Sequence, residues 1–263
     1  MKNSIAYQYC KWAVNKRNTK APIYVKKQCQ LWMDIVDDKD DEAYIHEQTY
    51  TIVIKLLHLM IHPDLQKPID IALDKYQMFL ITALFCTRSR EDDSRYYQTA
   101  ILEIARKNFK TFTSAVIFIL LMLIEPKFSR FFSVAPDLKL SKELQLAIRK
   151  IIKSSPFLCN EQSPVFKTLR NEIRCLITDS EYTPLAYSED KMDGKMANCF
   201  LADEAGAMDT YPVAAMRSSQ ITLFNKLGII ISTQYPNDNN VMIDEIDKAK
   251  KTLDGLRRNK RTF

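Results

Sequence analysis

The sequence predicts an α/β protein with a mostly parallel sheet, helices on both faces of the sheet, and a helical segment before it. Residues 198–202 and 227–233 are uninterrupted apolar runs, which are typical of strands buried on both faces. Such runs alternate with longer stretches of helical spacing, and this alternation favours a parallel sheet. Before residue 85 the apolar residues recur at helical spacing only, which predicts the helical N-terminal segment.

The elements are expected in the following order. Residues 1–85 are helical, with apolar positions such as Ile35, Tyr44 and Ile52 and an acidic turn at 37–42. Strands are expected at 97–105, 130–135, 172–178, 183–187, 198–202 and 227–233, and helices from about 110, from 137 to about 152, and over 241–256. We divide the chain into a helical segment 1–85, an α/β core 86–256 and a basic tail 257–263.

Composition limits the possible functions without choosing one. Of the 263 residues, 46% are apolar and 27% are charged, as in an ordinary globular protein with a substantial core. The net charge of +6 permits contact with nucleic acid but does not require it. The six cysteines form no CxxC pair, and the three histidines complete no metal set, so buried reduced thiols are expected.

No membrane segment is predicted. The N-terminus is polar and charged, which does not fit a signal peptide. The longest apolar run, residues 115–124, is too short to cross a bilayer and predicts a buried helix. We expect a soluble intracellular protein without membrane contact.

The first candidate site is the strand, polar loop and helix over residues 97–124. A phosphate-binding loop needs converging backbone N–H groups, a helix N-terminus, a lysine for the phosphate charge and a hydroxyl for Mg²⁺. Lys110 and Thr111 supply the last two, but Phe109 stands where a glycine belongs and the loop has no glycine. We expect Phe109 to avoid left-handed backbone geometry, which Asn108 tolerates better. A plain basic turn is the alternative.

The second candidate site is an apolar strand that ends in two carboxylates, Asp203 and Glu204, as in the Walker B pattern. Neighbouring strand side chains point to opposite sides, so the two carboxylates can take separate tasks. Asp203 would hold Mg²⁺ through water, and Glu204 would polarise the attacking water as general base. An acidic turn with Glu204 as a helix-capping residue is the alternative.

Two weaker signals accompany these motifs. Residues 228–234 are a buried strand ending in Ser232 and Thr233, whose hydroxyls could sense a γ-phosphate, although a core strand with a polar end looks the same. Upstream, Gln77 could pair with an adenine edge by donating and accepting at once, and Tyr76 could stack on the base. A surface glutamine on an amphipathic helix is the alternative.

Over nearly the whole chain these segments resemble the large terminase subunits of tailed bacteriophages. In that family a glutamine in an aromatic helix contacts adenine, as Gln77 could within KYQMFL, and a loop RKNGK[ST] follows a strand, here residues 106–111. A DG pair at 193–194 precedes the Walker B segment FLADEAGAM, and IISTQ is similar to the family's coupling motif. The resemblance implies a P-loop NTPase fold of the ASCE/RecA-like class, with residues 86–256 as its ATPase core.

The resemblance also implies roles for single residues. Lys110 would bind the β- and γ-phosphates, Thr111 and Asp203 would hold Mg²⁺, and Glu204 would activate water. The loop residues expected at the nucleotide are Arg106, Lys107, Asn108, Phe109, Lys110 and Thr111, with Arg106 reporting loss of the γ-phosphate. Ser232 and Thr233 would relay that change. Candidates for an arginine lent to a neighbouring subunit are Arg217 and Arg149, and candidates for DNA phosphates are Lys16, Arg17, Lys20, Lys26, Lys27 and the run 257–261.

The activity that the resemblance implies is Mg²⁺-dependent ATP hydrolysis that drives double-stranded DNA into an empty capsid. Expected partners are DNA, held by its phosphates without regard to sequence, the portal protein, the small terminase subunit and further copies in a ring, with the isolated domain a monomer. The protein would be virally encoded, act in the cytoplasm of the infected bacterial host and be no structural part of the mature virion. A nuclease domain follows the ATPase in this family, so we expect a fragment or split subunit without nuclease activity.

Two other interpretations stay open. A helicase-like P-loop motor would share Lys110, Asp203 and Glu204, but it should carry a second RecA-like domain with an arginine finger in the same chain. A non-hydrolysing nucleic-acid or protein-binding domain with a decayed P-loop is favoured by the glycine-free loop. The intact pair of adjacent carboxylates argues against decay.

Overall fold

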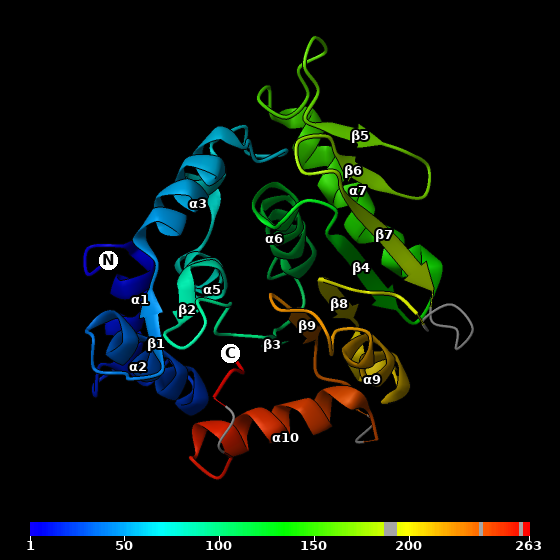
Figure 1. Ribbon diagram of the computed structural model, residues 1–263. Coiled ribbons are helices and arrows are strands. Elements are labelled where there is room, and N and C mark those ends of the chain that lie inside the picture. Colours follow the sequence, from blue (N-terminus) through cyan, green and yellow to red (C-terminus); the bar gives the residue numbers. More distant parts are fainter. Residues whose placement is uncertain (187–193, 237–238, 258–259) are drawn as a thin grey trace.

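The structure is a computed structural model that describes residues 1–186, 194–236, 239–257 and 260–263. Within these ranges a seven-stranded sheet lies at the centre, in the order β3-β9-β8-β4-β7-β6-β5 (Figure 1). The strands are β3 Thr99–Glu103, β4 Arg130–Ala135, β5 Phe166–Thr168, β6 Ile173–Cys175, β7 Ser180–Ala186, β8 Cys199–Asp203 and β9 Leu227–Ser232. Neighbouring strands from β3 to β7 pair in parallel, and β6 and β5 pair antiparallel. The predicted mostly parallel sheet is confirmed.

Apolar side chains cover both faces of this sheet. Along β9, Ile229 and Ile231 belong to one hydrophobic cluster, whereas Ile230 belongs to the other. Phe131 and Phe132 on β4 divide in the same way. Since successive strand residues point to opposite faces, a strand buried on both sides must be apolar at every position. This explains the uninterrupted apolar runs in the sequence.

Helices lie on both sides of the sheet, as predicted (Figure 1). The helix α6, Lys110–Ile124, packs against α7, Leu138–Ser154, and both contribute to the cluster that contains Ile229. On the other side, α9, Tyr211–Ser218, and α10, Val241–Leu253, cover the cluster that contains Ile230. A short 3₁₀ turn, η1 Ala205–Ala207, follows β8. Because the strands are parallel, the loops after β3, β4, β8 and β9 share one edge of the sheet.

The N-terminal segment is mainly helical and shares the first hydrophobic cluster with α6. Its elements are α1 Ile5–Val14, α2 Ile23–Val36, β1 Ala43–Ile45, α3 Glu47–Leu59, α4 Ile69–Ala72 and α5 Lys75–Cys86, followed by β2 Thr87–Ser89. The helical expectation is wrong at Tyr44, which lies in β1 and pairs with Arg88 of β2. A three-residue strand leaves no periodic signal, and its pairing partner is distant in sequence.

The C-terminal residues lie along the free edge of the sheet. The N–H of Phe263 donates to the carbonyl of Thr99 at 2.8 Å, and the carbonyl of Phe263 accepts from Ile101 at 3.0 Å. The Phe263 ring packs on Phe79 with ring centroids 5.1 Å apart, and Lys260 pairs with Glu42 at 2.9 Å. The tail thus covers the edge strand β3, whose backbone groups would otherwise lack partners. Residues 258 and 259 of the predicted basic run lie outside the described residues.

Some boundaries differ from expectation. The strand expected at 172–178 is only three residues long, β7 begins at Ser180, and β5 was not expected. Tyr187, placed at the end of a strand, and Asp193 of the DG pair lie outside the described residues. Strands that belong to a small antiparallel hairpin carry too few apolar positions to fix their ends.

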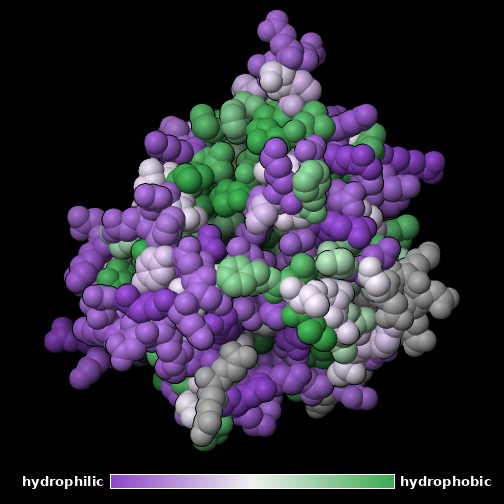
Figure 2. All heavy atoms as spheres, viewed as in Figure 1, coloured by the Kyte–Doolittle hydropathy of each residue, from purple (hydrophilic) through white to green (hydrophobic). Residues whose placement is uncertain are grey.

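The cysteines and the surface agree with what the composition of the sequence predicts. All six cysteines are free thiols, and only Cys159 is exposed. In the described part of the chain, no helix is long and apolar enough to cross a membrane. Figure 2 shows hydrophilic residues over most of one face, with a hydrophobic area in the part of the view where α3 and α6 lie.

Candidate functional site

The loop before α6 adopts a left-handed turn in spite of having no glycine. Phe109 is the N-cap of α6 at φ 57° and ψ 29°, and Lys107 has φ 68°. The expectation that Phe109 avoids this geometry is wrong. A left-handed conformation costs a non-glycine residue on the order of 1 kcal/mol, which the packing of α6 and β3 around the loop can outweigh. The Phe109 ring is 60% exposed, so it fills no core position that would explain the aromatic side chain.

The start of α6 is open to an anion. Among the described residues, no side chain caps the helix, in contrast to the aspartate that caps α7. The first N–H groups of a helix lack intrahelical partners and carry partial positive charge, so they attract phosphate. Thr111 lies half-buried in the first turn. The loop therefore provides the helix N-terminus that a phosphate site requires.

Lys110 brings the two predicted motifs together. Its ammonium lies 3.0 Å from the carboxylate of Asp203 and also forms a salt bridge with Glu204. Burial lowers the pKa of Lys110, but the two carboxylates outweigh this effect and raise it overall. For Asp203 burial is the larger influence and raises its pKa, which Lys110 offsets only in part. The two directions are compatible because Asp203 is the more deeply buried partner, so desolvation weighs more on it.

Glu204 is held in a strained position. It has φ 57°, its backbone N–H donates to Asp203 at 2.9 Å, and its second carboxylate oxygen accepts from the Tyr235 hydroxyl at 3.1 Å. Left-handed non-glycine residues gather at functional sites, where the surrounding structure imposes them. One oxygen of the Glu204 carboxylate therefore faces Lys110, and the Tyr235 hydroxyl holds the other oxygen in place.

Tyr235 and Gly206 belong to the site and were missed by the sequence reasoning. Burial raises the pKa of Tyr235, and the neighbouring Glu204 carboxylate raises it further, so the phenol stays a hydrogen-bond donor. A Cβ at Gly206 would lie 2.4 Å from the Tyr235 ring, so only glycine permits this approach. The available signals were the tyrosine two residues after Thr233 and the glycine two residues after Glu204.

Ser232 and Thr233 lie at the end of β9, beside β8, as the order of motifs predicts. Both are buried, and the Ser232 hydroxyl accepts from the Gly206 N–H at 3.0 Å while donating to the Thr233 carbonyl at 2.8 Å. Ser232 thus links β9 to the turn that carries Glu204. This contact can transmit a displacement between the two segments, whatever the ligand.

Gln77 and Tyr76 connect the N-terminal segment to the loop. Gln77 is 2% exposed; its amide oxygen accepts from the Asp74 N–H at 2.7 Å, and its amide nitrogen donates to the Thr113 hydroxyl at 2.5 Å. The Tyr76 hydroxyl donates to the Asn108 carbonyl at 2.8 Å, and burial raises the pKa of Tyr76 to about 12. Both amide groups of Gln77 therefore have partners within the protein. Its contact with adenine stays a prediction.

A mostly apolar cavity of about 410 Å³ lies beside these residues. It extends between the N-terminal helices, β3 and α10, and Tyr76, Ile104 and Lys250 are among the lining residues. Ile104 lies two residues before Arg106, the first loop residue, and Tyr76 donates to the carbonyl of Asn108 in the loop, so this cavity and the α6 N-terminus are neighbours. An aromatic ring system attached to a phosphate group fits such a pair of sites.

The other predicted residues have separate environments. Arg106 and Lys107 are exposed on the loop, and the Arg106 charge lowers the pKa of Tyr235, an effect smaller than those of burial and Glu204. Arg217 forms two hydrogen bonds with Glu245, a residue only 2% exposed, and Arg149 donates to the Leu169 carbonyl.

The basic residues proposed for DNA contact are not all free. Lys16, Arg17 and Lys20 are exposed, whereas Lys26 donates to the Asn18 carbonyl at 2.5 Å and Lys27 forms a salt bridge with Asp254.

The donor set fits a magnesium nucleotide. A carboxylate, Asp203, and a hydroxyl, Thr111, are the hard oxygen ligands that Mg²⁺ uses with only one or two protein groups. No cluster of three or more histidine, cysteine or acidic side chains that could hold a metal by protein ligands alone occurs in the described ranges. The observation that supports this fit to Mg²⁺ is that the Lys110 ammonium lies between the Asp203 and Glu204 carboxylates. Two adjacent negative charges here attract a cation, which Mg²⁺ could supply when Lys110 moves to the phosphates.

Comparison with known proteins agrees with this geometry. The family model described as "Terminase large subunit, ATPase domain" matches residues 75–251. Among solved structures, the large terminase of bacteriophage HK97 is similar with a TM-score of 0.64 and 25% identity, over 77% of this chain and 41% of that one. The chain therefore spans less than half the length of that terminase. No curated protein sequence matches the chain.

Two further structures are more distant. The ATPase domain of the large terminase of Thermus phage P74-26 is 14% identical with a TM-score of 0.44, over 56% of this chain and 64% of that one. A large terminase from a thermophilic bacteriophage, solved in complex with ADP, is 9% identical with a TM-score of 0.47, over 71% of this chain and 50% of that one.

Proposed function

The chain belongs to the family of terminase large-subunit ATPase domains, and we propose that it hydrolyses MgATP to drive double-stranded DNA into a viral procapsid. The observation that carries the proposal is the salt bridge of Lys110 with Asp203 at 3.0 Å and with Glu204, at the open N-terminus of α6. A P-loop lysine and adjacent Walker B carboxylates meet in this way when one strand-helix unit binds phosphate and another strand of the same sheet carries the residues for hydrolysis.

The residues act in the following way. The N–H groups at the start of α6 and the ammonium of Lys110 hold the phosphates, so Lys110 must exchange its carboxylate partners for phosphate oxygens. Thr111 and Asp203 would hold Mg²⁺, and the bound ion would neutralise negative charge on the phosphates. Glu204, freed from Lys110 and oriented by Tyr235, accepts a proton from the attacking water. Catalysis of this kind consists mainly of positioning and electrostatic stabilisation.

The adenine base is proposed to occupy the apolar cavity beside Tyr76. The cavity volume of about 410 Å³ and its lining by Tyr76 and Ile104 support this placement. In this arrangement Tyr76 contacts the base directly, while Gln77 holds Asp74 and Thr113 and so fixes the helix beside the loop. The Arg106 and Lys107 side chains remain exposed and available to phosphate oxygens.

The proposed partners follow from the family. They are double-stranded DNA, the portal protein, the small terminase subunit and neighbouring copies in a ring that lend an arginine to each site. The protein would act in the cytoplasm of the infected host and be absent from the mature virion. Since Arg217 is paired with Glu245, it would have to leave that partner before it could reach a neighbouring site.

The test is Mg²⁺-dependent binding of a fluorescent ATP analogue to the chain and to two lysine variants. We expect micromolar binding to the wild type, loss of binding in Lys110→Ala, and no change in Lys127→Ala, which removes an exposed lysine just beyond the other end of α6. A melting temperature for each variant excludes unfolding as the cause. If wild type and Lys110→Ala bind alike, or neither binds at millimolar nucleotide, the chain is not a working ATPase domain and the decayed-loop interpretation replaces it.

A further inference from the structure

A separate cavity, lined mainly by basic residues, lies beside α7. Its volume is about 480 Å³, and it is lined by one face of α7 together with Arg170, which follows β5 in the β5–β6 turn. The charged groups that line it are Lys139, Lys142, Arg149 and Arg170, against one carboxylate, Glu143. None of the residues assigned to the nucleotide within the same chain lines this cavity, although Arg149 is one of the two candidates for an arginine lent to a neighbouring subunit. Its positive charge therefore needs an explanation of its own.

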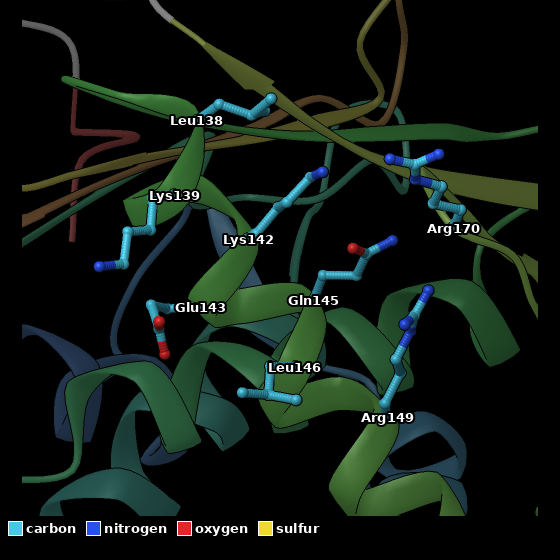
Figure 3. Close-up of a pocket in the computed structure, with 8 residues that line it drawn as sticks. All are labelled: Leu138, Lys139, Lys142, Glu143, Gln145, Leu146, Arg149 and Arg170. Carbon is cyan, nitrogen blue, oxygen red and sulfur yellow. The ribbon is translucent and has the colours of Figure 1, made fainter.

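The side chains converge on one point. Lys142, Gln145 and Arg149 are spaced three and four residues apart, which places them on the same face of α7. In Figure 3 these three point from the helix toward Arg170, which approaches from the opposite side. Lys139 and Glu143 point away from that meeting point. The arrangement is a cluster of donors around a common centre rather than a random basic surface.

Two buried donors in this cluster have no acceptor. Gln145 is 4% exposed, yet within the described chain its amide nitrogen makes no hydrogen bond. The Nε of Arg149 is also buried without a partner among the described residues, although its Nη2 donates to the Leu169 carbonyl. Folded proteins rarely leave buried donors unpaired because each costs the hydration it had in the unfolded chain. Gln145 and Arg149, the residues that carry these two donors, both line the cavity.

The chemistry of the missing partner follows from the donors. In the described ranges neither Lys142 nor Arg170 forms a salt bridge, so the charge of the cavity is not neutralised from within. Lysine, arginine and a glutamine amide nitrogen only donate. The ligand must therefore supply hydrogen-bond acceptors, and an anion does so while it neutralises the positive charge. The acceptor sites of a carboxylate lie in one plane, whereas the four donating side chains here approach from two directions, which fits a tetrahedral phosphate group better.

We propose that this cavity is a phosphate-binding site, with Gln145 and Arg149 as its buried donors and Lys142 and Arg170 as its charged rim. A free phosphate ion and the backbone of DNA both carry the group that fits. The cavity shares no residue with the loop before α6, so we expect phosphate to bind there whether or not ATP is bound. In a protein that moves along DNA, such a site would hold the backbone without reading sequence.

The first experiment measures melting temperature in phosphate, succinate and chloride at equal ionic strength and pH. Phosphate is expected to raise the melting temperature of the wild type above its value in chloride. In Gln145→Leu and Lys142→Ala most of that rise should be lost, whereas Lys150→Ala, which removes an exposed lysine from the same helix outside the cavity, should keep it. The P-loop also attracts phosphate, so the quantity compared is the difference between each variant and the wild type.

The Gln145→Leu variant separates an effect on phosphate binding from an effect on the stability of the fold. If Gln145 were only a buried structural residue, replacing an unpaired donor by an apolar side chain of similar size would leave the chloride melting temperature unchanged or raise it, with no effect on the phosphate response. The proposal predicts the same or higher stability in chloride together with a lost phosphate response. Equal phosphate responses in wild type, Gln145→Leu and Lys142→Ala would overturn it, as would a succinate response as large as that of phosphate.

The second experiment identifies the source of the phosphate with a labelled duplex DNA titrated at several salt concentrations. If the DNA backbone is the ligand, Lys142→Ala and Arg170→Ala should weaken binding about tenfold and reduce the slope of log affinity against log salt by about one. Lys150→Ala should change affinity by less than about twofold. If only the response to free phosphate is lost, the site serves a small phosphate ligand, and the proposal holds in that form. ATP binding, measured in parallel, should be unchanged in every cavity variant.

Discussion

The helices α6 and α7 each follow a strand of the parallel sheet, but they hold their positive charges in opposite ways. α6 begins with a strained Phe109 and no side-chain cap in the described structure, and its Lys110 is already paired with two carboxylates. α7 begins regularly, with Asp137 accepting from the Leu140 N–H at 2.9 Å. Its cavity instead contains cations that form no salt bridge within the described chain, together with two buried donors, the Gln145 amide nitrogen and the Arg149 Nε, that lack an acceptor there.

This difference separates the proposed site of ATP hydrolysis at α6 from the proposed site at α7 that only binds phosphate. In the proposed nucleotide site at α6, the internal salt bridges would be exchanged for phosphate contacts, so ligand binding would change the partners of Glu204 and could alter its proton affinity. At α7 a ligand completes hydrogen bonds that are missing and displaces nothing. At the strained loop, ligand binding can therefore change the ion pairs of Lys110 and Glu204. At the regular helix α7, the unpaired donors can only bind and release the ligand.

The largest expected effect is loss of turnover in Glu204→Gln. The amide keeps the size and shape of the side chain but cannot accept a proton from water, and a general base contributes about a hundredfold to ten-thousandfold to rate. We expect hydrolysis to fall by about a thousandfold while nucleotide affinity stays within a few fold, because Lys110 and the start of α6 are intact. Single-turnover hydrolysis with excess protein gives the rate, and equilibrium binding gives the affinity.

The matched control is Glu143→Gln, which removes an exposed carboxylate on α7 that points away from the side chains of Lys142, Gln145 and Arg149. It should hydrolyse ATP like the wild type. An unchanged rate in Glu204→Gln would mean that Glu204 serves only to hold Lys110 and Tyr235, and Asp203 would then be the remaining candidate base.

A medium effect is expected from relief of strain in Phe109→Gly. Phe109 and Phe128 are both exposed phenylalanines with left-handed backbones, at φ 57° and 67°. Replacing either with glycine removes a left-handed penalty on the order of 1 kcal/mol, partly offset by the greater freedom of glycine in the unfolded chain. Both variants should therefore raise the free energy of unfolding slightly, as measured by urea denaturation.

Nucleotide binding separates the two phenylalanines. Of the two, only Phe109 is the N-cap of α6, the helix proposed to hold phosphate, so only Phe109→Gly should change the affinity for the ATP analogue, with a gain of up to about fivefold. Phe128→Gly should bind as the wild type does. If both variants bind equally well, the strain at Phe109 has no connection with the phosphate site.

The sequence was sufficient to predict which segments meet at the site but not how they meet. The order of Lys110, Asp203 and Ser232 at the ends of apolar strands predicted their common edge, because parallel strands end on one side of a sheet. The left-handed Phe109 could not be predicted from propensity, since a penalty on the order of 1 kcal/mol is small beside the packing that fixes both ends of the loop.

Contacts between distant segments were also beyond the sequence. Tyr235 reaches Glu204 only because Gly206 leaves room for its ring, and the positions of these two residues beside the motifs do not by themselves predict that contact. The spacing of Lys142, Gln145 and Arg149 places them on one face of the helix expected from 137 to about 152, but a basic helix face is normally solvated surface. Arg170 turns that face into a cavity, and its approach depends on the β5–β6 hairpin, which the sequence did not predict.

The smallest expected effect concerns the buried carboxylate at α6. Burial raises the pKa of Asp203 in the folded protein, and the Lys110 charge offsets this only partly. A carboxyl group whose folded pKa is raised stabilises the fold below its unfolded pKa, near 3.8, and that contribution is lost as the pH rises through the folded value. Asp203→Asn imitates the protonated form and keeps the oxygen that accepts from the Glu204 N–H.

We therefore expect Asp203→Asn to be slightly more stable than the wild type at pH 7, by less than about 1 kcal/mol, with the difference disappearing below pH 4. Melting temperatures at both pH values test this, with the exposed Asp64→Asn as control. A difference that is equal at the two pH values would contradict the assignment to burial. The same variant should lose Mg²⁺-dependent nucleotide binding, so a gain in stability with a loss of ligand would show that Asp203 is kept charged for its function at a cost to the fold.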